Sequence, residues 1–74
     1  MIESMGQRIR RARKDKKWSQ KTLSEVSGVH IQAISKYERD LCVPSILSAQ
    51  YIAESLGVSL DWIAGRPGAT RIYW

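Results

Sequence analysis

The chain has 74 residues, a net charge of +5 and a single cysteine, Cys42. This length fits one small domain without a separate ligand-binding domain, and a lone cysteine excludes a disulfide within the chain. We find no signal peptide and no apolar run near the roughly 20 residues of a membrane span, so we expect a cytoplasmic protein with no membrane partner.

The positive charge is concentrated in the first half of the chain. Residues 1–39 carry ten basic and four acidic side chains, a net charge of +6, whereas residues 40–74 stand at −1. A field of this sign attracts a polyanion, although a basic stretch taken alone is more often a solvated surface. The same half holds the motif described below, and this coincidence favours a nucleic-acid partner.

The hydrophobic pattern predicts five short helices and no sustained strand, so the expected fold is all-α. Ser4 and Gln7 have the spacing of a capping box, and Ser19 suits the cap of the next helix. The predicted helices cover residues 4–17, 20–27, 30–39, 45–56 and 60–64. We place the domain at residues 1–67 and treat residues 68–74 as a C-terminal tail.

Apolar residues at helical spacing mark the faces that we expect to be buried. Leu23 and Val26 form this face in the second helix, and Ile34 and Tyr37 form it in the third. In the fourth helix the face consists of Ile46, Ala49, Ile52, Ala53 and Leu56. We also expect Trp18, Tyr37 and Trp62 to anchor the core.

Gly28, between the second and third helices, marks the most informative stretch of the chain. A glycine can adopt a positive φ, which lets one helix end and the next leave at a steep angle. Two short helices joined in this way predict a helix-turn-helix, whose second helix can enter a DNA major groove. The polar face of that helix carries His30, Gln32, Ser35 and Lys36.

Three segments in a fixed order resemble the lambda-repressor-like, Cro-type helix-turn-helix proteins of phages and bacteria. They are MGQRIRRARKDKKWSQKTL, SGVHIQAISKYER and PSILSAQYIAESLGVSLDWIAG, and the resemblance covers roughly residues 5–65. It implies a compact five-helix domain that binds operator DNA, usually as a two-fold dimer.

The resemblance also implies roles for individual residues. Ser19 and Gln20 match positions that contact phosphate, and Arg13 and Glu38 match a pair that forms a salt bridge between the first and third helices. The positions that face base edges are His30, Ile31, Gln32 and Lys36.

Three positions depart from or test the pattern of this family. A small hydroxyl residue is common where His30 stands, and because histidine is a poorer helix cap we expect it to contact DNA instead. Asp40 replaces a common glycine, and aspartate tolerates the left-handed conformation better than most residues. Ser24 should fit the position of a small residue early in the second helix.

The chemistry of these side chains suits the reading of DNA. Gln32 can pair bidentately with adenine, Lys36 can donate to guanine O6 and N7, His30 can donate to an acceptor such as N7, and Ile31 can pack on a thymine methyl. Further phosphate contacts, or else ordinary surface charges, are Arg8, Arg10, Arg11, Lys21, Ser35 and Arg39.

A second apolar stripe on the fourth helix predicts a subunit contact, although extra core is the alternative. Leu47 and Tyr51 are four residues apart and share a face that does not carry Ile52 or Leu56. The tail ends in three apolar residues that we expect to pack on a partner subunit or on the chain's own core, namely Ile72, Tyr73 and Trp74.

The sequence therefore predicts a transcriptional regulator, most simply a repressor. It would bind a palindromic double-stranded operator as a homodimer, with the third helix in the major groove, in the bacterial cytoplasm or on the nucleoid. Activation of transcription stays open. The alternative is an antitoxin or other protein-binding module. We expect no enzyme, metal or cofactor, because the single His30 and Cys42 stand on separate elements and no ligand cluster or phosphate loop is evident.

Overall fold

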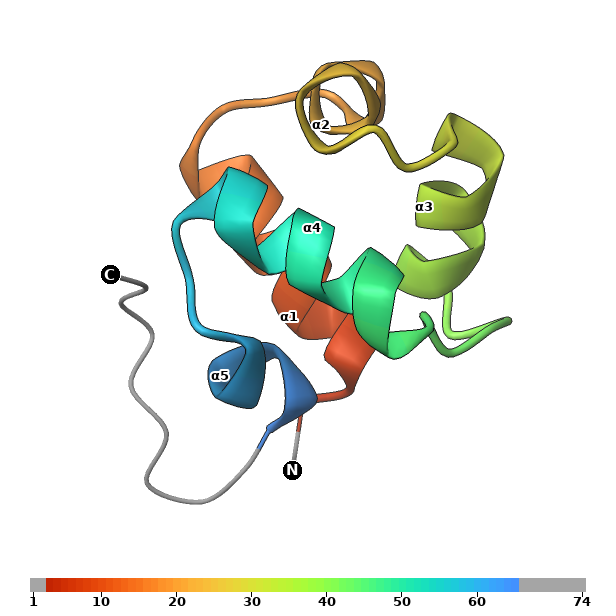
Figure 1. Cartoon of the computed structure of the whole chain (residues 1–74), viewed down its shortest axis with the longest axis vertical. Helices are drawn as coiled ribbons and strands as arrows, with labels where there is room; N and C mark the ends of the chain where they lie inside the picture. The colour runs from red at the N-terminus through yellow and green to blue at the C-terminus, as the bar shows by residue number, and fades with distance from the viewer. Residues whose placement is uncertain (1–2, 66–74) are drawn as a thin grey trace.

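The computed structural model describes residues 3–65, and within this range it contains helices and no strand (Figure 1). The helices are α1 (Met5–Asp15), α2 (Gln20–Ser27), α3 (Ile31–Glu38), α4 (Ile46–Leu56) and α5 (Leu60–Ala64). Helix α1 packs against α3, α4 and α5, while α2 packs against α3 and α4. The predicted all-α, five-helix fold is confirmed. The domain boundary at residue 67 and the predicted contacts of Ile72, Tyr73 and Trp74 lie outside the described residues.

The predicted helix bounds agree with the structure except at a few ends. Helices α2 and α5 have the expected bounds, whereas α1, α3 and α4 each begin one residue later than expected. The reason is that the residue predicted to start each of these helices is its N-cap instead. Helix α1 ends at Asp15 rather than Lys17, because Lys17 adopts a positive φ of 61°. Helix α3 ends one residue early, at Glu38.

Each helix begins at a side chain that accepts a hydrogen bond from its first turn. Ser4 and Gln7 form the predicted capping box, with Ser4 N–H donating to Gln7 Oε1 at 2.8 Å and Gln7 N–H donating to Ser4 Oγ at 3.1 Å. A cap of this kind is worth about 1 kcal/mol. The N-caps are Ser4, Ser19, His30, Ser45 and Ser59.

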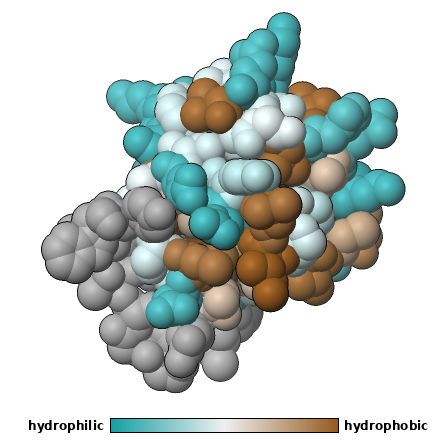
Figure 2. All heavy atoms as spheres, in the orientation of Figure 1, coloured by the Kyte–Doolittle hydropathy of each residue, from teal (hydrophilic) through white to brown (hydrophobic). Residues whose placement is uncertain are grey.

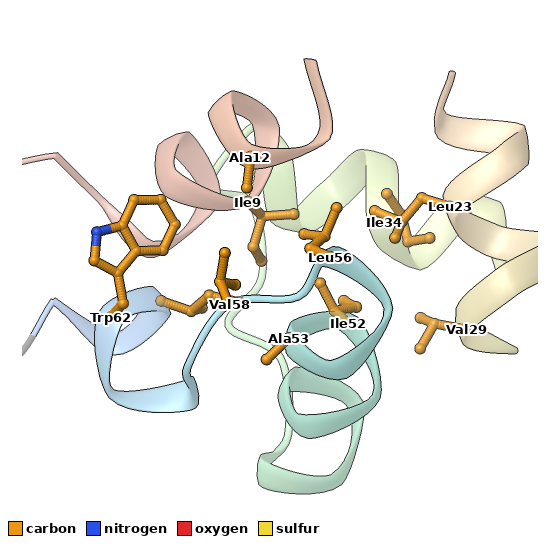
Figure 3. Packing of buried hydrophobic residues seen from close by; sticks show 11 residues of the cluster. Ile9, Ala12, Leu23, Val29, Ile34, Ile52, Ala53, Leu56, Val58 and Trp62 are labelled. Carbon is orange, nitrogen blue, oxygen red and sulfur yellow. The ribbon is translucent and has the colours of Figure 1, made fainter. Parts of the chain in front are cut away.

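The core lies where the five helices pack together, and each helix contributes one large aliphatic side chain that is fully buried; Figure 3 labels most of this cluster. Burying each of these side chains contributes roughly 1.5–3 kcal/mol. Helices of 5 to 11 residues are not stable alone in water, so this shared core holds them. The five side chains are Ile9, Leu23, Ile34, Ile52 and Ile63.

Most of the predicted core is confirmed, but the prediction of burial is wrong for two residues. Trp62 is buried, and Trp18 and Tyr37 are partly buried against the core. Val26 is 55% exposed and Ile46 is 80% exposed. Each lies one turn beyond the part of its helix that reaches the core. In α4 burial begins only one turn later, and in α2 only Leu23 is buried.

The start of α1 lies against the end of α3 at an unusually close backbone contact. A Cβ atom added to Gly6 would overlap the carbonyl oxygen of Tyr37 and lie 2.6 Å from Oδ1 of Asp40. Asp40 has a φ of 60°, in agreement with the left-handed conformation expected of it. Its Oδ2 accepts a hydrogen bond from Ser4 Oγ at 2.8 Å. This contact fixes one end of α3 relative to α1.

Candidate nucleic-acid interface

The turn between α2 and α3 is held by a short set of hydrogen bonds. Gly28 has a φ of 78° and its N–H donates to the carbonyl oxygen of Ser24 at 2.9 Å. The Ser24 hydroxyl donates to the Val29 carbonyl at 2.6 Å, and Val29 N–H donates to Ser27 Oγ at 3.1 Å. An alanine at position 24 would have no hydroxyl for this bond. The predicted helix-turn-helix is therefore present, and its turn is fixed from both sides.

The outer face of α3 brings together the four residues predicted to read bases. His30, Ile31, Gln32 and Lys36 are all exposed, and Ile34 on the opposite face is fully buried. Within residues 3–65, the side chains of Gln32 and Lys36 have no hydrogen-bond partner. Their polar atoms are thus available to a ligand without the loss of an internal bond.

A shallow groove of about 400 Å³ runs beside this outer face. It lies between α3 and the segment that connects α3 to α4. The groove is lined by His30, Gln32, Ala33, Lys36, Tyr37, Cys42 and Val43. Three of the predicted base readers therefore share one concave surface with two residues of the connection.

Behind the outer face, α3 is fixed to α1 by a buried ion pair. Arg13 donates from Nε to Glu38 Oε2 at 2.8 Å and from Nη2 to Glu38 Oε1 at 2.9 Å. Its Nη1 donates to the carbonyl oxygen of Trp18 at 2.7 Å. The side chains are only 10% and 2% exposed, respectively. The pair implied by the family resemblance is present, and its bidentate geometry sets the orientation of α3.

Gln20, at the first position of α2, extends this network toward the surface. Its Nε2 donates to Glu38 Oε1 at 3.2 Å. The amide nitrogen carries a second hydrogen, which this bond does not use. Gln20 is half-buried and thus joins the start of α2 to the inner side of α3.

His30 caps α3, contrary to the expectation from sequence. Its Nδ1 accepts a hydrogen bond from the backbone N–H of Gln32 at 3.1 Å, with φ and ψ of −60° and 138°. An imidazole nitrogen serves here in the place of a hydroxyl oxygen. The ring remains exposed, so the cap does not remove it from the outer face.

The residues predicted to contact phosphate fall into two groups, and Arg10 lies apart from both. One group lies around the helix-turn-helix: Ser19, Gln20 and Lys21 begin α2, and Ser35 and Arg39 belong to α3 and its C-cap. Ser19 Oγ caps α2 by accepting from Thr22 N–H at 3.0 Å, and Arg39 Nε donates to the Ser35 carbonyl at 3.3 Å. Arg10 is exposed on α1.

The second group, Arg8 and Arg11, lies over the ring of Trp62 on α5. The guanidinium carbons are 5.2 and 5.4 Å from the ring centroid, and Arg11 also pairs with Glu3 at 3.0 Å. Helix α5 packs on α1 and α4, on the opposite side of the molecule from α3 (Figure 1). The structure therefore does not bring these two arginines together with the outer face of α3.

A second exposed surface is apolar and lies on α4 and the connection that precedes it. We call Leu41, Val43, Ile46, Leu47 and Tyr51 the apolar ridge; each is exposed, from 45% at Tyr51 to 80% at Val43 and Ile46. Figure 2 shows hydrophobic side chains gathered over the first half of α4. Leu47 and Tyr51 thus lie on the surface as expected, and three further apolar residues extend it.

The described part of the chain shows no metal centre and no membrane span. Within residues 3–65, no three His, Cys, Asp or Glu side chains are grouped so that they could hold a metal ion. No helix in the same range has the length and apolarity needed to cross a bilayer.

Sequence reasoning missed the residues whose role depends on how the chain turns after α3. Cys42 and Val43 reach the groove because the left-handed Asp40 redirects the backbone, and no periodic pattern covers this connection. Gly6 had no signal other than being a glycine within a predicted helix, where glycine costs about 1 kcal/mol relative to alanine. A glycine at such a costly position is explained by a close backbone contact, and the structure shows one with Tyr37.

Comparisons with known proteins agree with this geometry. Residues 9–63 match the helix-turn-helix family. The structure is similar to the P22 c2 repressor in complex with synthetic operator 9T, with a TM-score of 0.79, 34% identity, and coverage of 84% of this chain and 94% of that chain. It is similar to the N-terminal DNA-binding domain of SinR from Bacillus subtilis, with a TM-score of 0.81, 34% identity, and coverage of 86% and 94%.

A longer SinR chain matches over only part of its length. The SinR chain in the SinR/SinI complex is also similar, with a TM-score of 0.81 and 34% identity, and the match spans 63% of its length. No curated protein sequence matches the chain. Because the family match covers most of the chain and agrees with the turn at Gly28 and the ordered motifs, the chain belongs to the Cro-type helix-turn-helix family.

Proposed function

We propose that this protein is a sequence-specific DNA-binding regulator of transcription, acting as a repressor, with the outer face of α3 in the major groove. The observation that carries the proposal is the contrast across α3: Gln32 and Lys36 are exposed and their side chains have no hydrogen-bond partner within residues 3–65, while Glu38 behind them is bonded to Arg13. The similarity to the P22 c2 repressor with its operator, and to SinR in complex with DNA at 37% identity, supports it.

The proposed base contacts follow from the chemistry of the outer face. The amide of Gln32 offers a donor and an acceptor, as adenine N7 and N6 require. Lys36 donates to guanine O6 and N7, and Ile31 packs on a thymine methyl. His30 adds a contact at the N-terminus of α3. A good bidentate contact discriminates between bases by about 1–3 kcal/mol.

The proposed phosphate contacts surround this face and hold it in register. Ser19, Lys21 and the unused amide hydrogen of Gln20 lie at the start of α2, and Ser35 and Arg39 flank the other side of α3. Arg10 is a further, more distant cation on α1. We leave Arg8 and Arg11 out of the interface because they lie over Trp62.

We further propose that two copies bind a palindromic operator through contacts between their apolar ridges. A two-fold contact places the same surface of each copy together, so an uncharged surface suits a chain of net charge +5. The domain measures 30 × 26 × 23 Å, and two such bodies side by side can present their α3 helices about 34 Å apart, one turn of DNA.

The test is selection of bound duplexes from a random DNA pool at about physiological salt. We expect an enriched inverted repeat whose half-site centres are about one helical turn apart. A Gln32→Ala, Lys36→Ala variant should enrich nothing, although it folds as the natural chain does. A Leu47→Glu variant should enrich single half-sites. Absence of any enriched sequence from the natural chain would overturn the proposal.

A protein partner is the second candidate for the apolar ridge. The similar SinR chain is described in a complex with the protein SinI, and all five residues of the ridge are exposed in the described part of this chain. The two functions can be separated by substitution, because Gln32 and Lys36 are not part of the ridge and Leu47 does not line the groove. If a protein partner is the main ligand, Leu47→Glu will abolish its complex, and replacement of Gln32 and Lys36 will leave that complex intact.

A further inference from the structure

The histidine at the start of α3 has one of its two ring nitrogens already engaged. Nδ1 of His30 accepts the backbone N–H of Gln32 at 3.1 Å, and this bond caps the helix. The ring is exposed and lines the groove beside Gln32 and Lys36. His30 is the only histidine in the chain.

This cap decides which tautomer the neutral ring adopts. A neutral imidazole has one nitrogen that accepts and one that donates. Because Nδ1 must accept from Gln32, the proton resides on Nε2. Toward any ligand in the groove the ring therefore presents a donor and no acceptor.

We infer that His30 is a specificity-determining residue that recognises hydrogen-bond acceptors only, through Nε2–H, on the edge of a base in the major groove. The acceptors there are N7 of either purine, O6 of guanine and O4 of thymine. The ring rejects an amino group, such as N4 of cytosine, at the same position. This inference rests on the proposed function, because it names what one residue of that interface reads.

His30 differs in this respect from its neighbours on the outer face. Gln32 carries both a donor and an acceptor, so it can pair with a base that offers both. Lys36 donates only, but from a flexible stem whose direction is not fixed. The ring of His30 is held at Nδ1 by the cap, so the direction of Nε2–H is set before DNA arrives. Its contribution is therefore directional.

The tautomer can be measured on the free protein by nitrogen-15 NMR of its single imidazole, at about pH 8, where an ordinary imidazole is neutral. We expect Nε2 to carry the proton and Nδ1 to be unprotonated. A proton on Nδ1 would overturn the inference directly, without any DNA in the sample.

The contact itself can be tested with two methylated histidines introduced at position 30 by chemical synthesis of the chain. A methyl on Nε2 removes the donor and leaves the cap, so we expect an unchanged Tm and about tenfold weaker binding to the selected operator. A methyl on Nδ1 removes the cap, so we expect a lower Tm. His30→Ser is the matched control, because serine keeps the cap but its short side chain carries no Nε2–H at the reach of the ring; it should bind as the Nε2-methyl protein does.

The outcomes separate this inference from the function on which it rests. If the natural chain selects an operator and the Nε2-methyl protein binds it equally well, His30 makes no base contact and the inference alone fails. If the Nε2-methyl and His30→Ser proteins lose as much affinity for random DNA as for the operator, the contact is to phosphate and the inference also fails. If the natural chain binds no duplex, the proposed function fails and takes the inference with it.

Discussion

The inner and outer faces of α3 differ in how far the rest of the protein fixes their side chains. On the inner face Ile34 is fully buried, and Glu38 accepts hydrogen bonds from Arg13 and Gln20. On the outer face Gln32 and Lys36 are exposed, and the structure gives their side chains no partner within residues 3–65. The core and the ion pair thus hold α3 through its inner face, and the side chains of Gln32 and Lys36 on the outer face are free to contact a ligand.

This arrangement predicts that stability and binding can be changed separately. Substitutions on the inner face should lower the free energy of unfolding, and substitutions of Gln32 or Lys36 on the outer face should lower affinity for DNA without destabilising the fold. The small size of the domain sharpens the contrast, because a total stability of only a few kcal/mol makes each inner contact a large share.

The largest effect is expected when the buried ion pair is broken. Glu38→Ala leaves the guanidinium of Arg13 buried without its carboxylate, which costs about 3–5 kcal/mol. Urea denaturation at low temperature measures the loss. A loss below about 1 kcal/mol would mean that the pair behaves as an exposed one and does not fix α3.

A double variant is the control for this result. Arg13→Met combined with Glu38→Leu removes both charges and keeps apolar volume, and such replacements are often neutral or stabilising. We expect the double variant to be more stable than Glu38→Ala. If it is equally unstable, the loss comes from packing and not from an unpaired charge.

A somewhat smaller loss is expected at the contact between α1 and the end of α3. Gly6→Ala forces a Cβ into the carbonyl oxygen of Tyr37, so α1 must shift, at a cost of about 1–3 kcal/mol. In an unobstructed helix interior the same change would stabilise by roughly 0.5–1 kcal/mol. The sign of the change in Tm therefore decides the point. An increase in Tm would show that the two helices are not in close contact.

On the outer face, Gln32→Ala should change binding and leave folding intact. We expect operator affinity to fall by about 1–3 kcal/mol and discrimination at one base pair per half-site to relax. The free energy of unfolding should change by no more than about 0.5 kcal/mol. Titration of the selected operator and of single-base variants measures the first effect. An equal loss of affinity for all sequences would contradict a base contact.

Much of the fold could be predicted from the sequence because its signals are local. The caps at Ser4 and Ser19 and the glycine at position 28 are short-range features, and the structure shows all of them. Helical periodicity and the family resemblance predict that the outer residues of α3 lie together. Their exposure follows from the burial of Ile34 on the opposite side.

The remaining features depend on contacts between distant parts of the chain. Arg8 and Arg11 have the same chemistry as the other basic residues, and only the position of Trp62 beneath them shows that they face away from α3. Ile46 continues an apolar stripe that the core does not reach. The sequence predicts that His30 does not cap α3, because helix caps prefer hydroxyl side chains. Only the structure shows that its ring nitrogen accepts the bond that a hydroxyl oxygen would accept.

The two groups of arginines offer the smallest but most discriminating prediction. Arg39→Gln removes a cation beside α3, and the slope of log affinity against log salt concentration should fall by about 1 for each lost phosphate contact. Arg11→Gln removes the same charge from the surface of Trp62, and its slope should stay close to that of the natural chain. Both variants have the same net charge, so a difference between them reports position and not the overall field. An equal fall in both slopes would mean that DNA also contacts the side of α1 that packs on α5, so the interface would extend to that side. Two unchanged slopes would mean that Arg39 makes no phosphate contact.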